Sequence, residues 1–178
     1  MKKAIVSNKF MLALAGICLS SMLFAQGGTP ASPPATATGK TKDGANITIQ
    51  YSSPGVKGRK IWGDLVPYDK VWRAGANQAT IFTTDKEVKI EGKKLPAGKY
   101  SLYAIPGEKE WTIILNSATG QWGINRDGST TEDPAKDVLR VKVKPKKSKE
   151  FTERMAYVVG DKTVSLVWEN VEVPIEVK

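Results

Sequence analysis

The chain has 178 residues, a single cysteine, no histidine and a formal net charge of +9. This length is enough for one domain with its own hydrophobic core. Histidine is the usual neutral-pH base and transition-metal ligand, so its absence excludes Ser-His-Asp, Cys-His and His-metal sites. Any catalysis would have to use carboxylates, lysine, tyrosine or a bound cofactor.

Residues 1–25 have the features of an export signal. Three lysines precede an apolar run from Phe10 to Phe24, which is too short and too interrupted by Gly and Ser to span a bilayer. The small residue Ala25 ends this run, so we expect a signal peptide that is cleaved there and a mature chain that begins at Gln26. The mature protein would be exported, periplasmic or secreted, and would keep no transmembrane helix.

The cysteine, Cys18, lies inside this signal. It fits a lipid-attachment site poorly, because Ile17 precedes it where a lipobox needs a small residue. After cleavage no thiol remains, so the packed core and not a disulfide must stabilise the fold.

Residues 26–45 are rich in Gly, Pro, Ala and Thr and contain almost no large apolar side chains. Such a segment buries little apolar surface, and this composition predicts a flexible leader. Residues 46–178 instead contain short runs in which apolar and polar residues alternate, as in Ile47, Ile49 and Tyr51. We therefore expect residues 46–178 to form a single β domain.

Turn signals separate these runs at short intervals, for example Asp43-Gly44, Pro106-Gly107 and Gly160-Asp161. No long amphipathic helix competes with the strands, and no βαβ spacing is present. The pattern predicts an all-β fold of about eight or nine short strands, arranged as an antiparallel β-sandwich or jelly-roll-like domain.

The segment of residues 52–78 departs from the strand pattern. It contains two tryptophans, two aspartates and a tyrosine among Gly and Pro, and it is too long for a simple connection. Long ordered loops of this kind are often functional. We therefore place the candidate site in this segment.

The second half of the segment contains the components of a small polar-ligand site. Arg73 can hold a carboxylate or phosphate through two parallel hydrogen bonds, Asn77 can donate and accept, and Trp72 can stack on a sugar ring. The alternative is a structural corner, in which these groups bind loop carbonyls and the tryptophans close one end of the sandwich. The sequence leaves both interpretations open.

Three more residues complete the candidate ligand-binding set. Trp62 and Asp64 lie earlier in the same segment, and Trp122 lies in a later connection. Asp64 and Asp69 are also candidates for the paired carboxylates of a hydrolase, although aspartates beside Gly and Pro are typical of turns. We assign no catalytic residue.

Two other patterns have simple structural interpretations. The oxygen-rich run of residues 125–133 fails as a calcium loop, because Gly123 and Pro134 would occupy its two carboxylate positions, and it predicts a hairpin turn. Arg140, Lys142 and Lys144 alternate with apolar residues, which indicates the exposed face of a strand. We expect no metal, no cofactor and no nucleic-acid partner.

Five phrases of the sequence, in chain order, carry a family resemblance. They are IWGDLVPYDKVWRAGANQAT, LPAGKYSLYAIPGEKEWTIILN, QWG, KDVLRVKV and LVWENVEVPIEV. Together they resemble the bacterial exported family named domain of unknown function 2911, over nearly the whole mature domain. The resemblance implies an exported protein of unassigned activity and supplies no catalytic residue. Gln78 stands where that family usually has an acidic residue, so no carboxylate role is expected there.

The sequence favours an uncharacterised exported β domain that binds a small polar ligand or an envelope partner without catalysis. Two alternatives stay open: a hydrolase of cell-wall or extracellular glycans with a carboxylate site, and a purely structural envelope module. A hydrolase would bring Asp64, Asp69 or Glu169 close to Arg73 in a concave pocket. A binding module would show exposed aromatic residues without such a pair.

Overall fold

A computed structural model describes residues 30–178, so the predicted signal peptide and the first residues of the predicted leader lie outside it. The strands are β1 (Pro34–Lys40), β2 (Asn46–Ser52), β3 (Thr80–Thr84), β4 (Val88–Ile90), β5 (Lys93–Leu95), β6 (Gly98–Ile105), β7 (Trp111–Asn116), β8 (Asp137–Val143), β9 (Lys146–Val159) and β10 (Thr163–Glu176). A single 3₁₀ turn, η1 (Pro134–Lys136), precedes β8. Within this described part, no helix is long and apolar enough to cross a membrane. The all-β prediction is confirmed.

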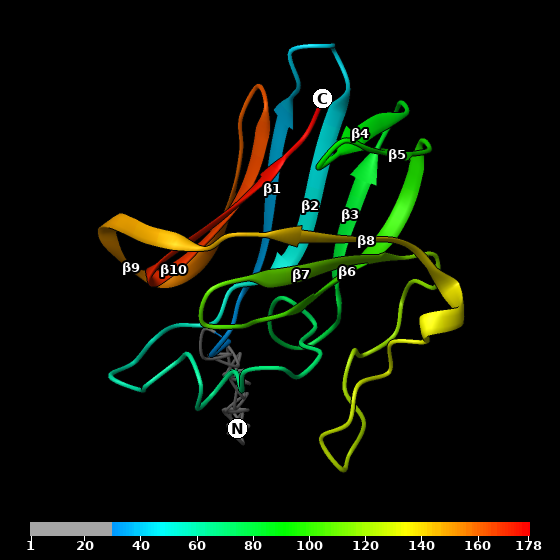
Figure 1. The fold of residues 1–178 in the computed structure, drawn as a ribbon. Coiled ribbons are helices and arrows are strands. Elements are labelled where there is room, and N and C mark those ends of the chain that lie inside the picture. Colours follow the sequence, from blue (N-terminus) through cyan, green and yellow to red (C-terminus); the bar gives the residue numbers. More distant parts are fainter. Residues whose placement is uncertain (1–29) are drawn as a thin grey trace, which may run out of the picture.

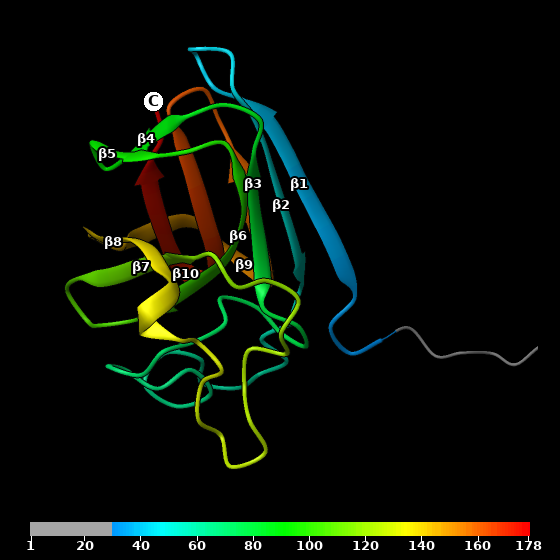
Figure 2. The same ribbon diagram turned by 90° about the vertical axis from the view of Figure 1, so that its right-hand side faces the viewer.

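The named strands pair only in antiparallel fashion (Figures 1 and 2). Six of them form one sheet in the order β1-β2-β3-β6-β7-β8, β9 and β10 form a long ribbon, and β4 and β5 form a short hairpin. The main core joins side chains of the six-stranded sheet, such as Ile49 and Ile113, to side chains of the ribbon, such as Met155 and Leu166. Apolar burial between these two layers is what holds them together.

The alternation seen in the sequence sets which face of each strand is buried. In β8, Leu139, Val141 and Val143 are buried, whereas Arg140 and Lys142 are exposed between them. Side chains of a strand point to opposite faces in turn, so this pattern places the basic residues on the outer face of the sheet. The interpretation of these cations as the wet face of a strand is confirmed.

The predicted flexible leader does not hold for residues 34–40, because they form β1. This strand pairs with β2 along its whole length, from Pro34 opposite Ser52 to Lys40 opposite Asn46. Its small residues have a packing role: a Cβ at Gly39 would lie only 2.6 Å from the side chain of Val159 in β9. Low apolar content was therefore a poor guide here, since backbone pairing and close approach of the layers need no large side chains.

Two long connections, residues 53–79 and residues 117–136, lie at the same end of the sandwich (Figure 1). They also meet in detail, because the backbone N–H of Ala79 donates to the carbonyl of Gln121 over 3.2 Å. Ala79 belongs to a second, smaller core with Tyr103 and Ile114. These two connections build the candidate site.

Candidate functional site

The loop of residues 53–79 is fastened to both layers of the sandwich. Near its start, Val56 donates to the carbonyl of Glu153 and Met155 donates to that of Pro54, which ties the loop to β9. Further along, Trp72 and Ala104 exchange two backbone hydrogen bonds of 2.8 and 2.9 Å, which ties it to β6. The loop therefore closes one end of the sandwich.

Four tryptophans pack together at this end of the sandwich, two from the loop and two from strands. The ring of Trp62 lies edge-on to those of Trp111 and Trp168, at centroid distances of 5.0 and 5.6 Å. Trp72 stacks on Trp168 at 6.1 Å. Trp111 and Trp168 are almost fully buried, and Trp62 is only 8% exposed. Trp62 thus packs as a core residue would, in line with the structural-corner interpretation of this one residue.

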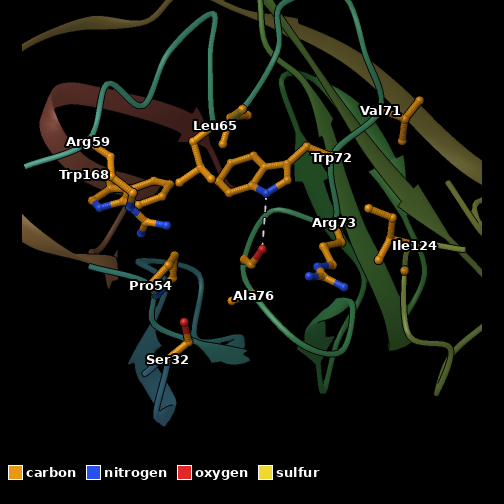
Figure 3. A pocket seen from close by; sticks show the side chains of 13 residues that line it. Ser32, Pro54, Arg59, Leu65, Val71, Trp72, Arg73, Ala76, Ile124 and Trp168 are labelled. Carbon is orange, nitrogen blue, oxygen red and sulfur yellow. Dashed lines mark hydrogen bonds between the residues drawn. The ribbon is translucent and has the colours of Figure 1, made fainter. Parts of the chain in front are cut away.

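A cavity of about 230 Å³ opens beside this cluster, between the two long connections (Figure 3). Its apolar wall includes Trp72, Trp168, Leu65 and Ile124, and two cationic side chains, Arg59 and Arg73, also line it. No acidic side chain of the described residues lines the cavity. The indole N–H of Trp72 donates to the carbonyl of Gly75 over 3.2 Å, which fixes the ring of the central tryptophan.

Backbone carbonyls orient both arginines. Arg59 donates from Nε to Val56 and from Nη2 to Gly55, over 3.1 and 2.6 Å. Arg73 donates from Nη1 to the carbonyl of Trp122 over 3.2 Å, and its guanidinium lies 5.9 Å from the centre of the Trp122 ring. Burial lowers the pKa of Arg73. The two guanidinium groups are thus held in place by carbonyls, and no carboxylate of residues 30–178 pairs with either of them.

Of the six predicted site residues, the structure brings two into the cavity lining, Trp72 and Arg73. Trp62 lies beneath the lining, in the buried cluster. Trp122 is 53% exposed and lies beside Arg73. Asp64 and Asn77 are exposed and do not line the cavity, and the Asn77 amide donates to the carbonyl of Ser32.

Arg59 and Trp168 are among the lining residues that the sequence did not indicate. Arg59 lies in the same loop, thirteen residues before Trp72, in a Lys-Gly-Arg-Lys run that offered no sign of where its side chain points. Trp168 lies on the apolar face of β10, a position that predicts a core residue. It is a core residue, and it also forms part of the cavity wall.

The carboxylates proposed for a hydrolase do not converge on Arg73 at this cavity. Asp64 and Asp69 are exposed on the loop surface, and Glu169 belongs to an irregular part of β10, opposite Thr152. None of the three lines the cavity. This site therefore lacks the paired acids that glycoside hydrolysis needs.

A different acidic pair is found on the outer face of the sheet. Arg140 donates from Nη2 to Glu132 over 2.6 Å and from Nε to Asp137, and Asn116 also donates to Asp137. The Glu132 side chain is only 2% exposed. Burial, with the charge of Asp137 second, raises the pKa of Glu132. Because Glu132 belongs to the connection of residues 117–136, this cluster fastens one wall of the cavity to β8.

The same connection contains the hairpin expected in place of a calcium loop. Ile124 and Thr130 form an antiparallel bridge, and Asn125 donates its backbone N–H to the carbonyl of Ser129 over 2.8 Å. Asp127 accepts from the backbone and hydroxyl groups of Ser129. Among residues 30–178, no group of three or more acidic side chains is placed to hold a metal ion.

These features define an antiparallel β domain with a loop-covered cavity at one end. A family model described as a protein of unknown function, DUF2911, matches residues 32–177, and the chain belongs to this family. The match includes β1, which sequence composition had assigned to a leader. No curated protein and no solved structure matches the chain.

Proposed function

We propose that this protein is a non-catalytic, exported β domain that binds a small molecule in the cavity beneath the loop of residues 53–79. The observation that carries the proposal is the cavity itself, an apolar recess with a tryptophan wall and a few oriented polar groups. Such a combination is typical of small-ligand sites. Its volume of about 230 Å³ suits a compact ligand such as a monocyclic compound.

Two observations separate this proposal from its alternatives. A glycan hydrolase would need convergent carboxylates, and no acidic side chain of the described residues lines the cavity. A purely structural module needs no recess between its loops, and it should bind none of the ligands that such a recess would admit. Ala76, which lines the cavity and is partly buried, offers a place to test this difference.

Trp72 and Trp168 line the cavity, so a bound ligand should change indole fluorescence. A library of monocyclic compounds, screened by fluorescence and thermal shift, should yield ligands for the natural protein. Ala76→Phe should fill the cavity, stay folded and lose these ligands. Ala135→Phe, on the exposed turn η1, is the matched control and should keep them. Unchanged binding by Ala76→Phe would show that this cavity is not the site.

The export part of the proposal rests on residues 1–25, with their lysines, apolar run and final small residue. Expression in a bacterial host and recovery of the exported fraction should give a chain that begins at Gln26, as read by intact mass. Retention of Met1, or a mass that includes diacylglycerol on Cys18, would overturn it.

A further inference from the structure

The charge of the cavity points to one class of ligand. We infer that the ligand carries a carboxylate, phosphate or sulfate group, and that the positive charge of Arg59 and Arg73 attracts this anionic group while the tryptophan wall contacts the rest of the molecule. The inference rests on the proposed function and adds the ligand's charge to it.

The first support is that neither arginine has an anionic partner in the part of the chain that the structure describes. The ion pairs among residues 30–178 include Arg140 but neither Arg59 nor Arg73. Burial lowers the pKa of Arg73, whereas hydrogen bonding to Asp137 is the main cause that raises the pKa of Arg140. The charge of Arg140 is therefore balanced by carboxylates, whereas the charge of Arg73 is balanced by none of the described residues.

The second support is that both guanidinium groups keep donors available. Within the described residues, Nη1 of Arg59 and the Nε and Nη2 atoms of Arg73 make no hydrogen bond. A guanidinium presents its N–H groups in a planar fork that matches a carboxylate or phosphate. Figure 3 shows the two side chains on opposite sides of Trp72, and both line the cavity, so each adds positive charge to it.

The third support is the way the structure holds Arg73 in place. Gly123 has a φ of 87°, and a Cβ at this position would lie 2.7 Å from the Cβ of Arg73. Glycine thus allows the 117–136 connection to pack directly against the arginine, while the carbonyl of Trp122 binds its Nη1. A partly buried cation that is fixed without a counter-charge costs free energy, and a bound anion offsets this cost.

The test compares probes of similar shape and different charge. Benzoate, phenyl phosphate and phenyl sulfate are titrated into the full mature chain by calorimetry, with benzyl alcohol as the neutral counterpart. At least one anion should bind about tenfold or more tightly than benzyl alcohol, and its affinity should fall as salt is added. The ranking of the three anions identifies the group that the site prefers.

Variants assign the effect to the two arginines. Arg59→Gln and Arg73→Gln should each lower the affinity for the preferred anion about tenfold and leave benzyl alcohol binding unchanged. Arg126→Gln removes the same charge from an exposed residue that does not line the cavity. This control should leave the affinity for the anion unchanged. If Arg73→Gln unfolds, Arg59→Gln decides, because that side chain binds only carbonyls of its own loop.

The possible results separate the two proposals. Benzyl alcohol that binds as tightly as the anions, without loss in either arginine variant, would refute the anionic ligand and keep the cavity as a binding site. Equal loss in Arg126→Gln would refute it too, because the attraction would then come from net charge alone. No binding of any probe at millimolar concentration would overturn both proposals.

Discussion

The loop-covered end of the sandwich has a sealed side and an open side, and tryptophans lie on both. On the sealed side, Trp62 contacts rings from both layers of the sandwich and is 8% exposed. On the open side, Trp122 is 53% exposed, and within residues 30–178 its one aromatic or cationic contact is with Arg73. The comparison teaches that a tryptophan in a loop is not by itself a sign of ligand binding. What matters is whether strands of both layers already occupy its faces.

Trp72 lies at the boundary between these two sides. One face stacks on Trp168 in the cluster, and the same residue lines the cavity. Its ring is fixed by backbone pairing to Ala104 and by the hydrogen bond to Gly75. A rigid, half-buried aromatic surface loses little conformational freedom when a ligand binds, which supports Trp72 as a contact residue of the proposed site.

The largest effect is expected at the centre of the sealed side. Trp111→Ala should lower the free energy of unfolding by about 3 to 5 kcal/mol, because it removes a ring that is 2% exposed and leaves a cavity in the core. Urea unfolding followed by circular dichroism measures this loss. A loss below about 1 kcal/mol would mean that the tryptophan cluster is not a stabilising core.

The next largest loss of stability is expected when Trp62 is removed. Its sequence context made it a candidate ligand-binding residue, but its burial against Trp111 and Trp168 indicates a structural role. Trp62→Ala should cost about 3 kcal/mol, close to the loss for Trp111→Ala. An unchanged urea midpoint, together with loss of ligand binding, would show that Trp62 is a ligand-binding residue and not a packing residue.

A smaller effect is expected at the cluster that fastens the 117–136 wall. Arg140→Gln leaves the carboxylates of Glu132 and Asp137 together without their cation, and should cost about 2 kcal/mol. Lys142→Gln is the control, because Lys142 lies on the same strand as Arg140 but forms an exposed ion pair, with Glu110. This substitution should lower the free energy of unfolding by less than about 1 kcal/mol. Equal losses in urea unfolding would show that the cluster has no special role.

Glu132 should also give this region a distinct pH dependence. Burial raises the pKa of Glu132 in the folded state, so its ionised form costs stability at neutral pH. This cost is relieved as the pH falls through the folded pKa towards the ordinary value of 4.5. The wild type should therefore gain stability relative to Glu132→Gln between neutral pH and about pH 4.5, as measured by urea unfolding. A constant difference between the two proteins would contradict the raised pKa.

Sequence periodicity was enough to find the strands whose side chains alternate, such as β2 and β8. It missed β1, because a strand of Thr, Ala and Gly is held by backbone pairing and by the close approach of Val159, which leave no apolar pattern. Local chemistry found Trp72 and Arg73 but not Trp168. That residue is 96 positions beyond Trp72 and enters the cavity wall only because the ribbon of β9 and β10 lies under the loop.

The smallest effect on stability, and the most direct probe of the open side, is expected at Trp122. Its ring is 53% exposed and lies over the guanidinium of Arg73, but the hydrogen bond from Arg73 goes to the Trp122 carbonyl, which alanine retains. Trp122→Ala should therefore change the free energy of unfolding by less than about 0.5 kcal/mol. An exposed cation–π contact contributes about 0.5 to 1 kcal/mol to the placement of the guanidinium, so anion affinity should fall about two- to fivefold, as measured by calorimetry. An affinity that stays unchanged would mean that the carbonyl alone orients Arg73, whereas a large drop in unfolding free energy would place Trp122 with the sealed tryptophans.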